Sequence, residues 1–344
     1  MKKKIAFEPH LDSINKAYED YFSDSEEFDF QILKKPRWKD NSRLKIIKMI
    51  IFMIKCFFDF STGKYDLVHL NGANFGIIAY FASFFKCKYI FTMHSSIQLD
   101  MNDNFRVKIL SKITKVLRPI IAKRAKQSFT ISDFSKSNLE NKYGIKLKVI
   151  YNGYQKERMY FETSKDLIDK YNLNGKILFI SVGRMVEYKN PFRVVDVFEQ
   201  AKKQIDNAFL IFIGKGILLN KVKEYVKKKD LDRDILFIKE IPYDDIRRWY
   251  SNATYFISGC DTEDFGLAPL EAVACRCFPI LPRGGAFPEI FIKDKYFYDI
   301  NEINNIKFYK STIEDKEYLS EVLKKYTWEK AISQYEQFYK LFTS

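Results

Sequence analysis

Glu263 and Glu271 are two acids separated by seven residues, and the second stands in the first turn of a predicted helix. The apolar run before them, Tyr255–Ser258, predicts a buried strand, and Leu270–Cys275 predicts the helix. Pro269 suits the start of that helix, because its missing N–H would be unpaired there anyway. Free backbone N–H groups at a helix start favour an anion. Acids beside an anion site fit a ligand that presents hydroxyl groups to carboxylates and phosphates to backbone amides.

A second segment carries two cations. Arg184 and Lys189 lie between a predicted strand, Ile177–Val182, and a predicted helix, Pro191–Gln204. Arg can hold a diphosphate through two parallel hydrogen bonds, and Lys adds a point charge. The loops that follow parallel strands open onto one edge of the sheet, so we expect this loop near the Glu263 loop. The alternative is a solvated basic loop without a ligand.

A third segment places His94 after the predicted strand Tyr89–Thr92. A ligand-facing histidine is one interpretation, and a purely structural histidine is the other. His69 lies within the predicted strand Leu67–Leu70, so we expect it to be buried, with Asn71 and the following glycine at the ligand side.

Taken together, these segments resemble the retaining glycosyltransferases of family 4 (glycosyl transferases group 1), which have the GT-B fold. The two glutamates, with Phe265-Gly266 between them, resemble the paired-glutamate motif of that family. The stretch from Gly183 to Lys189 resembles its signature for the donor diphosphate. The resemblance covers most of the chain from about Asp66 onward, and it includes four further segments: Thr130–Lys136, Val149–Gly153, Gly284–Ile290 and Tyr326–Glu329.

The resemblance implies roles for these residues. The residues implied to bind the donor are Gly183, Arg184, Lys189, Glu263, Phe265, Gly266, Leu267 and Glu271. Arg184 and Lys189 would stabilise the departing diphosphate, and Glu263 would hold the sugar or support positive charge at its anomeric carbon. Glu271 would hold the ribose, and His94 would orient the sugar from the other domain. The family requires no metal and no cofactor beyond the nucleotide-sugar, and no protein nucleophile is established for it.

The chain departs from the family pattern in two places, one of which is Arg276, where a glycine is common after the motif helix. The first loop, Glu8–Ser13, has no glycine pair, so close approach of its backbone to phosphate is in doubt. His10, Ser13 and Asn71 are the candidates on the acceptor side. The residues before Asp66 are the part that the resemblance explains least.

Strand-like and helix-like segments alternate along nearly the whole chain, which predicts parallel sheets covered by helices on both faces. The pattern relaxes through residues 154–174 and then restarts. We therefore expect two Rossmann-like domains, at 1–155 and 156–325, facing one another across a cleft. The resemblance implies that the first lies on the acceptor side and that the second binds the nucleotide-sugar. Residues 326–344 resemble the final helix of the family, which crosses back onto the first domain.

The composition is that of a globular protein, with 344 residues, 47% of them hydrophobic, and a net charge of +14. The five cysteines are scattered through apolar runs and, with three histidines, suggest reduced thiols and no metal site. Met1–Lys4 leads at once into a predicted strand, so no secretion signal is expected. A cytoplasmic location follows as the expectation.

Two features bear on membranes. The apolar stretch Ile46–Phe60 is too short to span a bilayer and is interrupted by lysines, so we expect a mostly buried helix, with an interfacial helix as the alternative. Cations are dense from Arg106 to Lys148. This basic span predicts either a solvated face or contact with an anionic membrane surface at the inner face of the cell membrane.

The predicted function is transfer of a hexose or N-acetylhexosamine, with retention, from a UDP- or GDP-sugar to a glycan or lipid-linked glycan, in the synthesis of cell-surface polysaccharide. An inverting transferase of the same fold and a nucleotide-sugar epimerase are alternatives. A basic nucleic-acid-binding protein is a third alternative, although none of the known binding motifs is found in the sequence.

Overall fold

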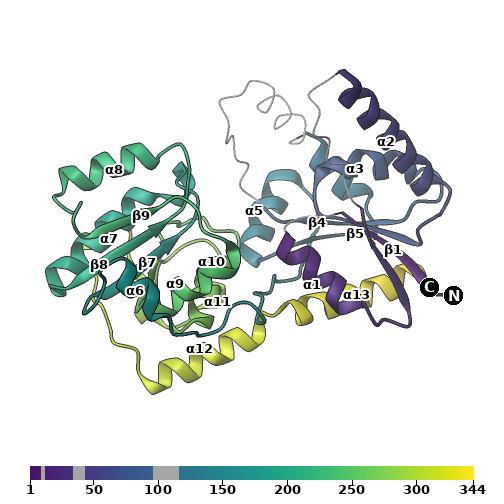
Figure 1. The fold of residues 1–344 in the computed structure, drawn as a ribbon. Helices are drawn as coiled ribbons and strands as arrows, with labels where there is room; N and C mark the ends of the chain where they lie inside the picture. Colours follow the sequence, from purple (N-terminus) through teal and green to yellow (C-terminus); the bar gives the residue numbers. More distant parts are fainter. Residues whose placement is uncertain (9–11, 34–42, 96–115) are drawn as a thin grey trace. The chain divides into compact units, whose positions relative to one another are not determined.

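The computed structural model describes residues 1–8, 12–33, 43–95 and 116–344 (Figure 1). The chain divides into two compact units. Unit 1 comprises Met1–Tyr151 together with Trp328–Ser344, and unit 2 comprises Asn152–Thr327. The boundaries expected from the sequence follow residues 155 and 325, close to these divisions. The cleft expected between the two domains stays a prediction.

In unit 1, the described strands form one parallel sheet in the order β2-β1-β3-β4-β5-β6. The strands are β1 (Lys3–Phe7), β2 (Phe28–Ile32), β3 (Leu67–Leu70), β4 (Tyr89–Met93), β5 (Gln127–Thr130) and β6 (Lys148–Val149). The helices are α1 (Asp12–Phe22), α2 (Arg43–Ser61), α3 (Ala73–Ala82), residues 116–124, α5 (Asp133–Tyr143) and α13 (Trp328–Thr343). The strand order reverses between β1 and β3: β2 lies on one side of β1, and β3 and the later strands lie on the other. In such sheets, ligands bind at this reversal.

In unit 2, the described strands form a second parallel sheet in the order β12-β11-β10-β7-β8-β9. The strands are β7 (Ile177–Val182), β8 (Ala208–Ile213), β9 (Ile235–Ile238), β10 (Tyr255–Ile257), β11 (Phe278–Pro282) and β12 (Phe297–Tyr298). The helices are α6 (Lys165–Lys170), α7 (Pro191–Gln204), α8 (Leu219–Lys228), α9 (Ile246–Asn252), α10 (Leu267–Ala274), α11 (Phe287–Ile290) and α12 (Ile313–Lys325). Here the reversal falls between β7 and β10, so the loops after these two strands are the expected ligand loops.

The last helix belongs to the core of unit 1, although it is farthest along the chain (Figure 1). Tyr335 and Tyr339 of α13 are buried with residues of α1 and of the sheet. His69 of β3 is fully buried, as expected, and contacts the Tyr339 hydroxyl through Nδ1 at 2.6 Å and Thr92 through Nε2 at 2.8 Å. Burial lowers the pKa of His69 to about 3, so the ring is neutral. This polar contact fixes α13 on the sheet.

Helix α2 corrects one expectation, because it is not mostly buried. Its inner stripe, with Phe52, Cys56 and Phe60, packs into the core of unit 1. Most of its other large apolar side chains are exposed. The reason is that α2 packs against α3, and a helix buries only the stripe that meets its neighbour. No described helix is both long enough and apolar enough to cross a membrane.

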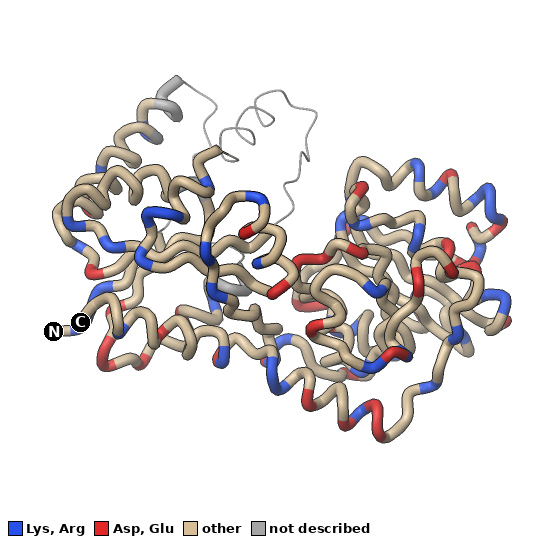
Figure 2. Tube along the Cα trace, turned by 180° about the vertical axis from the view of Figure 1, so that it is seen from behind, with Lys and Arg blue, Asp and Glu red and all other residues tan. Residues whose placement is uncertain are grey.

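Several elements differ from the sequence-based expectation. Helix α6 lies inside the stretch 154–174 that was expected to be a connection, and α12 and β12 were not expected. Of the basic span Arg106–Lys148, the first ten residues lie outside the part of the chain that the structure describes. Lysine and arginine are spread over both units (Figure 2).

Tyr339→Ala should destabilise unit 1 by about 3–5 kcal/mol, because it empties a core site for an aromatic ring. Tyr339→Phe keeps the ring and should cost only about 1 kcal/mol for the lost contact with His69. Leu341→Ala, at an exposed position of the same helix, is the control and should change stability by about 0.5 kcal/mol or less. Urea unfolding measures all three, and equal effects of Tyr339→Ala and Leu341→Ala would contradict the packing.

Candidate active site

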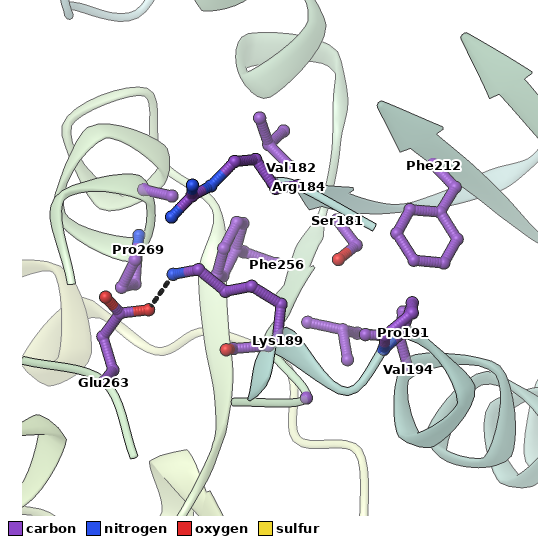
Figure 3. Close-up of a pocket in the computed structure, with 15 residues that line it drawn as sticks. Ser181, Val182, Arg184, Lys189, Pro191, Val194, Phe212, Phe256, Glu263 and Pro269 are labelled. Carbon is purple, nitrogen blue, oxygen red and sulfur yellow. Dashed lines mark hydrogen bonds and ion pairs between the residues drawn. The ribbon is translucent and has the colours of Figure 1, made fainter. Parts of the chain in front are cut away.

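A pocket of unit 2 lies where the loops after β7 and β10 meet (Figure 3). The two strands are direct neighbours, with Phe256 of β10 opposite Ile180 of β7. The first loop contributes cations, the second contributes a carboxylate, and the beginning of α10 closes the side. The polar or loop residues among the lining are Ser181, Gly183, Arg184, Lys189, Ser258, Gly259 and Glu263, and α10 adds Ala268 and Pro269. The structure thus brings together four residues that the sequence singled out: Gly183, Arg184, Lys189 and Glu263.

Lys189 and Glu263 form an ion pair across this pocket (Figure 3). Their side chains are 25% and 18% exposed, so solvent screens the pair only in part. Burial by itself would lower the pKa of Lys189, but the negative charge of Glu263 outweighs it and holds that pKa above its ordinary value. The ammonium group therefore stays charged at neutral pH. A phosphate that enters the pocket would compete with Glu263 for this cation.

Backbone contacts fix the loops that carry the pair. A Cβ on Gly259 would lie 2.3 Å from the carbonyl oxygen of Asn190, so only glycine lets these two loops touch. A Cβ on Gly285 would lie 2.5 Å from the backbone nitrogen of Glu263, and the N–H of Ala286 donates to the Glu263 carbonyl at 2.8 Å. The glycine-rich segment Gly284–Ile290, which resembles a donor-side loop of the family, thus packs against the backbone of Glu263 and fixes its position.

Two residues that the sequence reasoning missed complete the cationic side. Arg193 of α7 donates from Nη1 to the carbonyl of Gly259 at 2.7 Å and pairs with Asp261 at 3.2 Å. Tyr188 accepts a hydrogen bond from Nη2 of Arg184 at 2.5 Å. The Tyr188 ring also lies 5.1 Å from Nζ of Lys189, within the range of a cation–π contact. The sequence signal was position: Tyr188 lies in the loop between Arg184 and Lys189, and Arg193 lies in the first turn of the helix that follows.

Glu271 has a different partner from Glu263. It lies on α10 and does not line the pocket, and the Tyr243 hydroxyl donates to its Oε1 at 2.8 Å. Burial raises the pKa of Glu271 to about 7. Gly266 is the N-cap of α10 and Leu267 is its first residue. The Phe265 ring is buried against Tyr326, and Phe265 does not line the pocket.

In unit 1, a hydrogen-bonded chain links His94, which follows β4, to Asn71 and Glu8 at the neighbouring reversal between β1 and β3. The carboxylate of Glu8, which is buried, accepts from the backbone N–H of Asn71 at 3.1 Å and of Gly72 at 2.9 Å. The Asn71 amide nitrogen donates to the Glu8 carbonyl at 2.7 Å, so its Oδ1 is left to accept from Nε2 of His94, 2.9 Å away. His94 therefore carries a proton on Nε2. Glu8 was not expected to take part.

The remaining acceptor-side candidates are not placed. His10 lies outside the described residues, and the described part of Ser13 is its backbone in α1. Among the described residues, no group of three or more His, Cys, Asp or Glu side chains could hold a metal ion.

Comparisons with known proteins agree on one family. The family model described as Glycosyltransferase Family 4 matches residues 18–158, and the model described as Glycosyl transferases group 1 matches residues 163–330. An uncharacterized glycosyltransferase of Methanocaldococcus jannaschii is 27% identical over 71% of this chain and 66% of that protein. The O-antigen chain mannosyltransferase of Salmonella typhimurium is 24% identical over 70% of this chain and 67% of that protein.

Alignments with several curated relatives span only 20% to 66% of those proteins' own length. Among solved structures, the Anabaena protein HepE in complex with UDP and glucose has a TM-score of 0.72 at 15% identity, with 98% of this chain and 99% of that chain covered. At this identity the likeness concerns the fold.

Glu271→Gln should change how stability depends on pH. The folded protein holds a proton on Glu271 up to pH about 7, whereas the unfolded chain releases it near 4.5, so the wild-type free energy of unfolding falls as pH rises through this window. We expect the variant to gain up to about 2 kcal/mol over the wild type across it, because one pKa unit is about 1.4 kcal/mol and solvent weakens the effect at this partly exposed site.

Thermal unfolding of both proteins between pH 4.5 and 7.5 measures this difference. Glu224→Gln, at an exposed position of α8, is the control. A constant difference between Glu271→Gln and the wild type across the range would show that the carboxyl is not protonated there.

Proposed function

The chain belongs to the glycosyl transferases group 1 and has the GT-B fold, and from this premise we propose that it moves a hexose or N-acetylhexosamine from a UDP- or GDP-sugar to a glycan or lipid-linked glycan acceptor. We propose transfer with retention at the anomeric carbon and without a metal ion. The observation that carries the proposal is the pocket at the β7–β10 reversal, where two cations and a carboxylate converge (Figure 3).

The donor diphosphate would bind on the cationic side of this pocket. Lys189 would exchange its contact with Glu263 for a contact with phosphate, and Arg184 would supply a second cation. Backbone amides of Gly266 and Leu267, at the beginning of α10, would add donors to the same oxygens. As the bond to the sugar breaks, negative charge grows on the diphosphate, and donors already in place stabilise that charge most effectively.

Glu263, once released from Lys189, would turn to the sugar hydroxyls or to the positive charge that develops at the anomeric carbon. The acceptor hydroxyl would attack on the face from which the diphosphate leaves, with the bonding pair departing on the diphosphate oxygen. The proton of the acceptor would pass to a phosphate oxygen. Glu271 would hold the ribose, and His94 would orient the sugar from unit 1.

The proposed donor and acceptor classes are supported by the ligands and activities of similar proteins. HepE was crystallised with UDP and glucose, and the Salmonella relative is a mannosyltransferase of O-antigen chains. We propose that this chain likewise acts in the synthesis of a cell-surface glycan, from the cytoplasmic side.

Two kinds of measurement separate this proposal from its alternatives. A thermal-shift screen of nucleotides and nucleotide-sugars should reveal the donor, since a ligand at 100 times its Kd stabilises by about 2.7 kcal/mol. The anomeric configuration of the product distinguishes a retaining transferase from an inverting one, and release of a free epimer of the sugar nucleotide would identify an epimerase. Transfer that persists in a chelator supports the metal-independent reaction. Tight, salt-dependent nucleic-acid binding without nucleotide-sugar binding would favour the basic-protein alternative.

Lys189→Ala should lower kcat by roughly 10²–10³, the loss measured when one stabilising donor is removed from a developing anion. Glu263→Ala should lower kcat to a similar extent while the protein stays folded. Lys293→Ala is a matched control, because Lys293 also forms an ion pair in unit 2, with Glu314 at 2.7 Å, but does not line the pocket. Near-normal turnover by Lys189→Ala would remove Lys189 from the mechanism.

Asn71→Ala should lower kcat by roughly tenfold to a hundredfold, because His94 loses the partner that fixes its ring. Asn71 would be a positioning residue in unit 1, so the affinity for free UDP or GDP should not change. Asn71→Asp sets a carboxylate against the ring, which should raise the His94 pKa and move the acidic limb of the kcat–pH profile to higher pH. Asn138→Ala, at an exposed position of α5, is the control. An unshifted profile in Asn71→Asp would contradict the role.

A further inference from the structure

Helix α2 is apolar on two opposite faces, and only one of them is used in the core. Large apolar side chains on its outward face recur three or four residues apart, as one stripe of a helix requires. This outer stripe consists of Ile47, Ile50, Ile51, Ile54 and Phe58, whose exposure ranges from 49% to 61%. Scattered exposed apolar residues are ordinary on a protein surface, but a continuous stripe of five indicates a contact with something apolar.

The stripe continues onto the last turn of α3 and the turn that follows it. Phe81, Phe84 and Phe85 are each more than half exposed. The Phe85 ring lies 6.0 Å from the Phe57 ring of α2, and Phe57 lies 5.9 Å from Phe58 of the outer stripe. These contacts join the two elements into one apolar surface, which is formed by the outer stripe and the three phenylalanines. Figure 1 shows α2 and α3 together at one side of unit 1.

Cations surround this apolar surface. Lys48 and Lys55 are exposed on α2 beside the stripe, and Lys86 follows the phenylalanines. The Arg124 guanidinium lies 4.6 Å from the Phe84 ring and donates to Ser83. The residues nearby in the chain contain no acid from Leu67 to Ser95 or from Val116 to Ser132. Residues 47–61 of α2 contain one acidic residue, Asp59, and its carboxylate pairs with Lys64 at 2.7 Å.

We propose that this apolar surface docks on an anionic membrane, with α2 lying in the interface and its outer stripe inserted among the lipid chains. An interfacial helix combines a large apolar face with flanking lysines that reach the lipid headgroups, and α2 has both. The cations beside it match anionic headgroups, each contributing ~1 kcal/mol near the surface. The inference names a docking element other than the basic span Arg106–Lys148, and it does not depend on the proposed transfer reaction.

A second copy of the chain is the main rival occupant. Two-fold pairing through this apolar surface would bring the same patch of both copies together. Lysines beside the stripe would then face lysines, and the nearby Asp59 is already paired within its own chain. An anionic bilayer meets the same lysines with opposite charge, so charge favours the membrane.

The test is sedimentation of the full chain with vesicles, in the absence of donor and acceptor. Vesicles of phosphatidylcholine with a third phosphatidylglycerol should bind the wild type, and vesicles of phosphatidylcholine alone should bind it much more weakly. The double variant Ile50→Ser with Ile54→Ser should reduce binding at least tenfold. Each of Lys48→Gln and Lys55→Gln should reduce it about fivefold, which is the fold-change equivalent of ~1 kcal/mol.

Ile292→Ser with Ile313→Ser is the matched control, because both residues are exposed isoleucines of unit 2. It should bind vesicles as the wild type does. Equal melting temperatures of the two double variants exclude loss of folding, and the single lysine variants test the same surface without touching an apolar residue. Failure of the wild type to bind anionic vesicles, or undiminished binding by the stripe and lysine variants, overturns the proposal. A concentration-dependent dimer that the stripe variant abolishes would assign the surface to a second copy instead.

Discussion

The ion pair between Lys189 and Glu263 is the interaction on which the site depends. It joins the loops of two neighbouring strands, and both charges are partly shielded from water. Without its partner, the desolvation cost of either charge would not be offset. The pair keeps the pocket formed and charged before a ligand arrives. A donor with both a diphosphate and sugar hydroxyls could replace the two halves of the pair at once, which a phosphate alone could not.

The loops that carry Lys189 and Glu263 are held in place by close backbone contacts and by side-chain hydrogen bonds. Gly259 and Gly285 bring loop backbones into contact, and Arg193 fastens the Glu263 loop to α7. In unit 1, the reversal between β1 and β3 is used in a comparable way, with Glu8 binding the backbone after β3 and Asn71 holding His94. In both units, side chains proposed for chemistry lie at or next to the reversal of the strand order, and hydrogen bonds from neighbouring segments hold them in place.

Much of the fold follows from local sequence patterns, and so does part of the site. The alternation of apolar runs and helical stretches predicted the two sheets. The position of Arg184, Lys189 and Glu263 after predicted parallel strands indicated that they would lie at one sheet edge, and the family resemblance added Gly183. Contacts between distant segments were not readable: Glu8, Tyr243 and Arg193 acquire their partners only through the fold. For α2, the sequence favoured a mostly buried helix over its alternative, an interfacial helix, because an apolar pattern does not reveal how many faces of a helix pack against a neighbour. Helix α12 did carry a local signal, since Thr312 and Asp315 form a capping box.

Lys189 is proposed to bind the donor diphosphate after it leaves Glu263. Calorimetric affinities of UDP and GDP, without sugar, for the wild type, Lys189→Gln and Glu263→Gln test this exchange of partners. Lys189→Gln should weaken binding of the preferred nucleotide at least tenfold. Glu263→Gln should bind that nucleotide as tightly as the wild type or more tightly, because the competing carboxylate is gone. Equal weakening by both substitutions would show that the pair only supports the pocket and that Lys189 does not change partners.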